Sequence, residues 1–173
     1  GKKSGGKMEV NDYRMSIHFG ICTGPIDALK QIIVDEKEGW AGNLTAETEF
    51  NISKPNLFGG AKKEGGLTGK VRFLPGLLTQ VMPAHLASRM GLTTATCSAY
   101  RGIASIFMFG VAANTGFTWK ANMPYLPGVW AKVRRRPRGL NDAISMIGND
   151  ANPAHIIYEC MTNADWGMGT SPA

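Results

Sequence analysis

The sequence predicts a mainly β fold, a β-barrel or sandwich-like domain with one or two short α-helices. Apolar and polar residues alternate over several short segments, as they do in strands with one buried face. The 22 glycines and 9 prolines among 173 residues indicate frequent turns. Hydrophobic residues make up 43% of the chain and charged residues 18%, which is enough apolar material for one core and argues against disorder.

The clearest strand pattern lies at 13–21, where period-two alternation predicts one buried face. A Thr-Gly-Pro turn at 23–25 ends this strand. Residues 26–34 are expected to form a second strand, because three β-branched residues close the segment. Residues 35–37 then make a tight turn, after which Glu38 and Gly39 lead on to a tryptophan.

The next part of the chain predicts a weaker strand at 47–52 and another strand at 68–74. Between them, two glycine pairs flank a charged loop at 57–66, which indicates a mobile hairpin connection or a close approach of two backbone segments. A phosphate cradle would need a helix start after the loop. The sequence offers none there, so a structural loop is favoured.

The second half predicts a short helix at 83–90 that ends at Gly91. A buried strand is expected at 103–109 and a further strand at 129–136. The proline-rich stretch 122–127 is expected to be extended but not to lie in a central strand.

A last helix is predicted to start at Asn152, which suits the N-cap, followed by Pro153 at the first helical position. His155 is expected on the polar side. Trp166 begins a Trp-Gly-Met-Gly turn and is expected to anchor the exit from the helix. An apolar stripe is expected to pack on the β domain or on a neighbouring element, through Ile156, Ile157, Cys160 and Met161.

The chain is therefore expected to comprise a flexible lead-in at 1–11, a β-rich domain at 12–138, and a segment at 139–173 with a linker, the short helix and the exit turn. No apolar run approaches the roughly 20 residues that span a bilayer. The N-terminal residues lack the apolar core of a signal peptide, so the chain is expected to be soluble and not exported by its own signal.

The net charge of +6 is concentrated in one basic stretch near the end of the β-rich part. In a strand, Lys132, Arg134 and Arg136 share a face with Trp130, which would suit single-stranded nucleic acid. A solvated strand edge or a subunit contact explains the same pattern and is favoured. The possible interface or polyanion contact comprises Lys132, Arg134, Arg135, Arg136 and Arg138.

Few side chains of the sequence are candidates for metal binding or catalysis. His18 and Cys22 fall on one face of the first strand, yet two ligands do not make a zinc site, and no CxxC or HxxxH pattern occurs. His85 stands alone in its helix, while Glu47 and Glu49 are expected to be a solvated pair. We therefore predict no enzyme, no catalytic or metal-binding residue, no cofactor and no small-molecule substrate. Reduced, buried thiols are expected at Cys22, Cys97 and Cys160.

Five blocks in this order resemble the central tail-hub proteins of long-tailed phages, the family of the lambda-type tip attachment protein J and of the hubs of gene-transfer-agent particles. The blocks are a Gly-Pro turn followed by a Trp, a double-glycine loop, a Tyr-Arg-Gly strand start, an arginine-rich strand end and the Asn-Pro helix with its Trp-Gly turn. Outside the arginines given above, the matching residues are Gly24, Pro25, Trp40, Gly59, Gly60, Lys62, Lys63, Glu64, Gly65, Gly66, Tyr100, Arg101, Gly102, Asn152, Pro153, Trp166 and Gly167.

The resemblance implies a non-enzymatic virion structural protein, a viral tail protein located at the phage tail tip and assembled in the host cytoplasm. It would be one subunit of a homotrimeric baseplate hub that closes the tail tube and takes part in host attachment and genome ejection. The implied partners are the distal tail protein, the tape measure protein, other tail-tip proteins and, transiently, DNA in the lumen. Family hubs are several times longer, so the chain resembles a segment of the hub core or part of a split hub. A basic nucleic-acid-binding module and a tail-associated hydrolase remain the alternatives.

Overall fold

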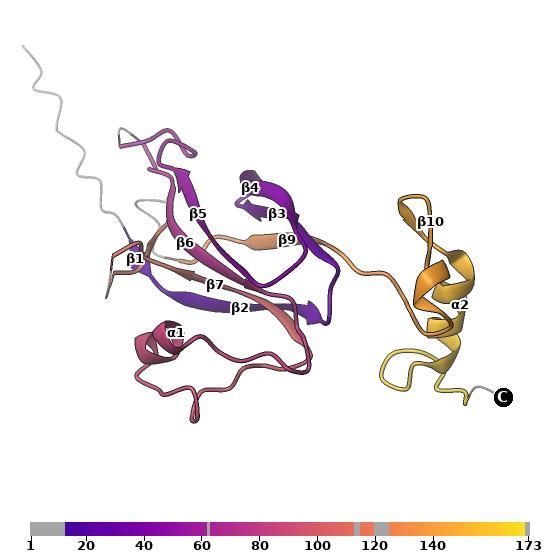
Figure 1. Ribbon diagram of the computed structural model, residues 1–173. Helices are drawn as coiled ribbons and strands as arrows, with labels where there is room; N and C mark the ends of the chain where they lie inside the picture. The colour runs from indigo at the N-terminus through magenta and orange to yellow at the C-terminus, as the bar shows by residue number, and fades with distance from the viewer. Residues whose placement is uncertain (1–12, 62, 113–114, 120–124, 172–173) are drawn as a thin grey trace, which may run out of the picture. The chain divides into compact units, whose positions relative to one another are not determined.

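The computed structural model describes residues 13–61, 63–112, 115–119 and 125–171, and its fold is mainly β with a nearly closed, barrel-like sheet and two helices, as the sequence predicts (Figure 1). The chain forms two compact units, Gly1–Val133 and Arg134–Ala173. The boundary lies a few residues before the predicted start of the C-terminal segment. The predicted lead-in at 1–11 lies outside the described residues.

The first unit is built around a six-stranded sheet in which every pairing is antiparallel. Its order is β1-β8-β6-β7-β2, and β5 pairs with β6. The strands are β1 Arg14–Met15, β2 Ile17–Thr23, β5 Thr48–Lys54, β6 Leu67–Leu74, β7 Ile103–Phe109 and β8 Phe117–Thr118.

A second sheet of three strands has the order β4-β3-β9, with β3 Ala28–Val34, β4 Lys37–Leu44 and β9 Val129–Arg134. Asp35 and Glu36 form the predicted tight turn between β3 and β4, with φ of 48° and 64°, as a two-residue hairpin requires. Strand β4 was not predicted, because its two glycines and irregular alternation hide the period of a strand.

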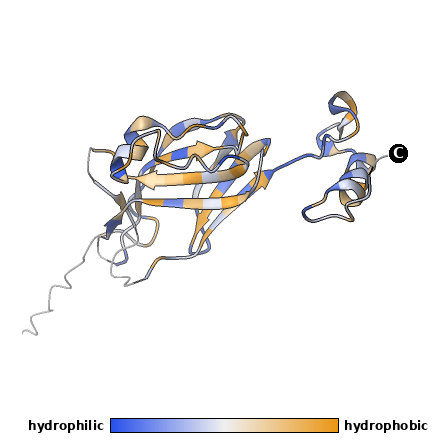
Figure 2. Ribbon diagram, turned by 90° about the horizontal axis from the view of Figure 1, so that it is seen from below, coloured by the Kyte–Doolittle hydropathy of each residue, from blue (hydrophilic) through white to orange (hydrophobic). Residues whose placement is uncertain are grey.

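Strand β7 is buried on both faces, and it therefore separates two apolar clusters. Hydrophobic residues recur along the strands of the first unit (Figure 2). Ile106 and Met108 belong to the larger cluster, which includes side chains of β3 and β6. Phe107 and Phe109 belong to a smaller cluster that Leu86 of the helix α1 (Ala84–Arg89) covers. The second sheet and α1 thus lie on opposite sides of the six-stranded sheet (Figure 1).

The first predicted strand is divided in the structure, since β1 and β2 are separated at Ser16. Its apolar side chains are not all buried. Tyr13 and Met15 are 45% and 44% exposed, whereas those of β2 pack against the larger cluster. A β-bulge follows Gly20 and shifts the register before Cys22. The buried face predicted for the whole segment is therefore limited to β2.

The helix predicted at 83–90 is confirmed as α1, Ala84–Arg89, with Gly91 in the left-handed conformation at its C-terminal end (φ 70°). Leu86 is buried, whereas Met90 is 38% exposed. The first residues of the predicted extended stretch, 122–124, lie outside the described residues.

The second unit contains a short 3-10 helix η1 Asp142–Ile144, a hairpin of β10 Met146–Ile147 and β11 Asp150–Ala151, and the helix α2 Pro153–Thr162. The predicted helix start is confirmed. Asn152 is the N-cap, its side chain accepts a hydrogen bond from the N–H of Ala154, and Pro153 occupies the first position.

We expect Ile106→Ala to lower the free energy of unfolding of the first unit by about 2–5 kcal/mol, because it leaves a cavity beside β6 in a close-packed core. Urea unfolding followed by the fluorescence of Trp40 and Trp119 measures this change. Ile103→Ala, at a 41% exposed position of the same strand, is the control and should cost about 1 kcal/mol or less. Equal losses in the two variants would contradict the assignment of the core.

Candidate functional site

Two of the resembling blocks, far apart in the sequence, meet where β2 ends and β7 begins. The Gly24 N–H donates a hydrogen bond of 2.7 Å to the Gly102 carbonyl. A Cβ on Gly24 would lie 2.8 Å from the Pro75 carbonyl oxygen, and one on Gly76 would lie 2.6 Å from the Ala104 nitrogen. We refer to Gly24, Gly76 and Gly102 as the glycine crossing. Backbone segments approach here so closely that a larger residue would force them apart.

The buried side chain of Gln80 stabilises the connection that runs from the glycine crossing to β7. Its Oε1 accepts from the Gly76 N–H at 2.9 Å, and its Nε2 donates to the Ala99 carbonyl at 2.7 Å. The Arg101 Nε donates to the Gln80 backbone carbonyl at 3.2 Å. Gln80 is 3% exposed. Arg101 was among the residues that match the motifs, but Gln80 was not predicted, because a single glutamine in a loop has no periodic signal.

The double-glycine loop is closed by its own backbone. Gly60 and Gly65 donate to each other's carbonyls at 3.1 and 2.9 Å, and Phe58 donates to Gly65 at 3.0 Å. A Cβ on Gly66 would overlap the backbone of Pro55. The loop is the hairpin connection between β5 and β6, and the close approach of backbone segments that the sequence indicated is observed within it. Gly59, Gly60 and Gly65 have positive φ, Lys63 and Glu64 are exposed, and Lys62 lies outside the described residues.

Trp40 has a packing role. Its half-buried ring lies 4.7 Å from the ring of Phe50, centroid to centroid, at the edge of the larger cluster. Nearby, the Lys37 ammonium donates to the Leu57 carbonyl at 3.1 Å and lies 5.3 Å from the centroid of the Phe58 ring. The β3–β4 hairpin is thereby connected to the double-glycine loop.

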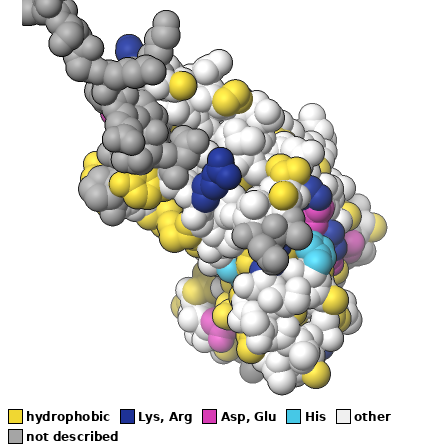
Figure 3. Space-filling view, turned by 90° about the vertical axis from the view of Figure 1, so that its left-hand side faces the viewer, with side chains coloured by type: hydrophobic (Ala, Val, Ile, Leu, Met, Phe, Trp, Pro, Cys, Tyr) yellow, Lys and Arg dark blue, Asp and Glu magenta, His cyan; other side chains and the backbone are white. Residues whose placement is uncertain are grey.

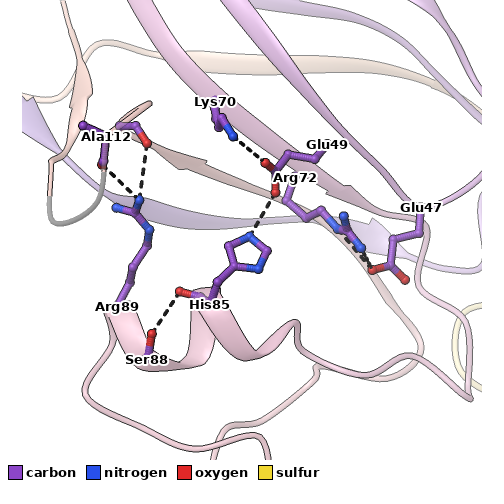
Figure 4. Close-up of polar contacts among 9 residues, drawn as sticks. Glu47, Glu49, Lys70, Arg72, His85, Ser88, Arg89 and Ala112 are labelled. Carbon is purple, nitrogen blue, oxygen red and sulfur yellow. Dashed lines mark hydrogen bonds and ion pairs between the residues drawn. The ribbon is translucent and has the colours of Figure 1, made fainter.

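The two acidic side chains predicted to be solvated form ion pairs with basic side chains of β6, and of the two Glu47 is exposed, as predicted, whereas Glu49 is half-buried. Figure 3 shows acidic, basic and histidine side chains next to one another on one face. Glu49 accepts from Lys70 at 3.0 Å, and its other oxygen lies 2.9 Å from the His85 Nε2 (Figure 4). Glu47 pairs with Arg72. His85 was expected to stand alone, but its contact with Glu49 connects α1 to β5. Cross-strand pairing, which one sequence does not reveal, brings these charges together.

This arrangement changes the acidity of Glu49. Partial burial alone would raise its pKa, but the hydrogen bonds and charges of Lys70 and His85 outweigh this and lower the pKa below its usual 4.5.

Arg89, at the other end of α1, donates to the carbonyls of Thr115, Ala112 and Gly110 at 2.9, 3.2 and 3.4 Å (Figure 4). Its guanidinium lies 4.8 Å from the centroid of the Phe109 ring. The two ends of α1 are thus attached to the sheet by polar contacts, which position the helix above the smaller cluster.

A cavity of about 280 Å³ lies against β2 and β7, lined by His18, Gly20, Tyr100, Ile103 and Ser105. The His18 Nε2 and the Ser105 Oγ are 2.9 Å apart. Burial lowers the pKa of His18 below 6.5, so its imidazole is neutral at pH 7. We refer to these five residues as the His18 pocket.

The prediction that His18 and Cys22 share one face of the strand is wrong, because the β-bulge after Gly20 turns Cys22 towards the larger cluster. In the part of the chain that the structure describes, no group of three or more His, Cys, Asp or Glu side chains is arranged to hold a metal ion. Of the thiols expected to be buried, Cys97 is buried, Cys22 is half-buried and Cys160 is exposed.

The predicted basic face is correct only as far as β9 extends. Trp130 and Lys132 point outwards, while the intervening residues pack against the larger cluster. The strand ends at Arg134, so Arg136 does not continue this face. The arginines that follow form ion pairs within the second unit, Arg135 with Glu159 at 2.7 Å, Arg136 with Asp142 at 3.7 Å and Arg138 with Asp142 at 3.1 Å.

The exit turn folds back onto the end of α2. The N–H groups of Gly167 and Met168 donate to the carbonyls of Asn163 and Cys160 at 3.0 and 2.8 Å. A Cβ on Gly167 would lie 2.5 Å from the Cys160 carbonyl oxygen, so glycine is required there. Trp166 is 53% exposed.

The predicted apolar stripe of α2 is not packed against other residues of its unit. His155, expected on the polar side, is fully buried, whereas Ile156, Ile157, Cys160 and Met161 are exposed. Asn152 fixes this orientation, because its N–H donates to the Ser145 carbonyl at 2.9 Å and its Nδ2 to the Ile144 carbonyl at 2.9 Å. The side of α2 next to η1 is therefore the side that carries His155.

No family model matches the chain, and a search of curated proteins finds no match to it. Membership of the tail-hub family therefore stays a prediction from the motifs. Among the described helices, none has the length and apolar character needed to cross a membrane.

We expect Gly24→Ala to destabilise the first unit by about 1–3 kcal/mol, because the added methyl group would collide with the backbone of Pro75 and Gly76. Gly20→Ala is the matched control. Its Cβ would meet nothing closer than 3.7 Å, so a change within about 0.5 kcal/mol is expected. Urea unfolding measures both variants, and a harmless Gly24→Ala would show that the glycine crossing is not a constraint.

We expect Glu49→Gln to destabilise the first unit by about 0.5–1 kcal/mol at pH 7. Because the folded-state pKa of Glu49 is lowered, its stabilising effect is present above pH 4.5 and is lost as the pH falls through the folded-state value. The difference between wild type and variant should therefore vanish at the acid end of a pH series of urea unfolding. Glu36→Gln, at an exposed turn position, is the control. A difference that does not change with pH would contradict the role of the ionised carboxylate.

Proposed function

We propose that the chain is a structural segment of the homotrimeric central hub of a long-tailed phage tail. In this role it helps to close the tail tube at the tail tip, where host attachment and genome ejection take place. Its partners are two further copies, the distal tail protein, the tape measure protein and other tail-tip proteins. The role requires no catalysis, cofactor or small-molecule substrate. The hub assembles in the host cytoplasm and is then part of the virion.

The positions of the resembling residues support this proposal. Gly24, Gly66 and Gly167 each occupy a point where an added Cβ would overlap backbone. Gly24 and Gly102, from two different blocks, are joined by a backbone hydrogen bond. Residues of this kind are specified by a fold, whereas a ligand site would be specified by side chains pointing into a cavity. The resemblance therefore concerns architecture, as expected for a structural subunit.

The single observation that most favours an assembly subunit is the surface of the second unit. Its fully buried side chains, among the described residues, are those of Ser145 and His155. Eight large apolar side chains are 43–75% exposed, at Leu140, Ile144, Ile147, Ile156, Ile157, Met161, Trp166 and Met168. Large exposed apolar surfaces mark sites of protein association. In a closed trimer each copy can present the same surface to a neighbour.

The alternatives receive less support. Arg135, Arg136 and Arg138 are paired with Glu159 and Asp142, which offsets the charge that a nucleic acid would bind. A nucleic-acid-binding module would require salt-dependent affinity that falls when Arg134 to Arg136 are replaced by alanine. A tail hydrolase would require activity on cell-wall peptide or glycan that is lost when His18 or Cys22 is replaced.

We expect the chain, alone or co-expressed with its tail partners, to form an assembly with three copies of the 18.6 kDa subunit. Light scattering after size-exclusion chromatography measures the mass. Ile157→Asp should weaken association at least tenfold, because a carboxylate would be buried in an apolar contact. Thr45→Asp, at an exposed site of the first unit, is the control and should leave the mass unchanged.

A chain that stays monomeric beside its tail partners, and that is absent from purified virions, would refute the proposal. Binding to single-stranded DNA at low salt, lost in the alanine variants of Arg134 to Arg136, would instead favour the nucleic-acid alternative.

A further inference from the structure

The His18 pocket is a cavity that neither the core nor the proposed hub function requires. Its volume of about 280 Å³ is just below the range of pockets for drug-sized ligands, and a cavity of about 150 Å³ already binds benzene in another protein. The pocket therefore suits a single ring.

Gly20 makes this cavity possible. Unlike the glycines of the crossing, it has neither a positive φ nor a backbone atom in the way of a Cβ, whose nearest neighbour would be the Ile103 Cγ2 at 3.7 Å. A glycine within a strand weakens the strand and often marks a place where a ligand approaches the backbone. Here the missing side chain leaves the floor of the pocket open.

Tyr100 forms one wall and is held in an unusual conformation. Its φ is 48°, in the left-handed region that non-glycine residues rarely occupy. Two hydrogen bonds hold this conformation. The Tyr100 N–H donates to the Ser98 Oγ at 3.2 Å, and the Tyr100 carbonyl accepts from the Ile103 N–H at 3.0 Å. The Tyr100 ring contacts the His18 ring edge-on, with centroids 5.2 Å apart. Such strained residues cluster at binding sites, and here the strain fixes an aromatic wall.

The polar groups of the pocket are few and uncharged. The His18 imidazole is neutral at pH 7, and its Nε2 shares a hydrogen bond with the Ser105 hydroxyl. Whichever atom donates, the Ser105 oxygen keeps a lone pair that can accept from a ligand. Ile103 and the Tyr100 ring supply apolar walls. A sugar, with hydroxyl groups around its whole ring, would leave most of them unpaired here.

We propose that the His18 pocket binds a phenol group, with the ring between Tyr100 and Ile103 and the hydroxyl on the Ser105–His18 pair. The phenol can belong to a free aromatic compound or to a tyrosine side chain of a partner protein. This inference does not depend on the proposed hub function.

The test uses the full chain, labelled with ¹⁵N and titrated with p-cresol, toluene and glucose while the amide shifts of Gly20 and Ser105 are followed. We expect saturable shifts with p-cresol, an affinity about fivefold higher than that for toluene, and no saturation with glucose. Ser105→Ala should remove the preference for p-cresol while toluene binding persists.

Gly20→Val should fill the cavity and abolish binding of both aromatic compounds. Gly128→Ala is the control, because its Cβ would make only an ordinary contact outside the pocket, and it should bind like wild type. The melting temperature of each variant shows whether it is folded. If Gly20→Val does not fold, Ser105→Ala still tests the proposal.

N-acetyl-tyrosinamide distinguishes the two sources of the phenol. Binding as tight as that of p-cresol supports a tyrosine side chain, and its exclusion while p-cresol binds supports a free compound. The proposal is overturned if p-cresol causes no saturable shift at Gly20 and Ser105, if Ser105→Ala retains the preference over toluene, or if glucose binds as well as p-cresol.

Discussion

The burial of both faces of β7 is the constraint on which the first unit depends. Ile106 and Met108 fill one apolar cluster, while Phe107 and Phe109 fill the other. A strand packed on both sides cannot shift by one residue without exchanging its two sets of side chains. The register of β7 with β2 and β6 is therefore fixed, and that register decides where the glycine crossing forms and where Ser105 meets His18.

Two different uses of glycine occur within a short distance of this strand. At Gly24 and Gly76 the absence of a side chain permits backbone segments to touch, so the glycine has a packing role. At Gly20 the same absence leaves a space that no neighbour occupies. The two uses look alike in the sequence, and only the surroundings of the missing Cβ distinguish them. The first kind specifies the architecture, and the second kind provides a cavity.

Local signals in the sequence predicted most of the fold, and the errors arose where distant residues decide the outcome. Turn chemistry at 35–37 and the Asn152-Pro153 cap were correct because each depends on neighbouring residues. The β-bulge after Gly20 reversed the face assigned to Cys22, and pairing of β5 with β6 gave Glu49 partners that its own strand does not reveal. The orientation of α2 depends on contacts of Asn152 with the η1 segment, so the sequence placed His155 on the polar side although it is buried, while the predicted apolar stripe is exposed on its own unit.

In the second unit the backbone groups at the ends of α2 are hydrogen-bonded within the chain, whereas the apolar side chains of the helix are exposed. Asn152 caps the start of α2, and the exit turn donates to the carbonyls at its end. Both ends of the helix are thus saturated within the chain, although its apolar side chains are not covered. A partner that binds this surface meets a helix that is already formed, so binding does not have to offset the entropic cost of ordering that helix. Association would then proceed as docking between preformed surfaces.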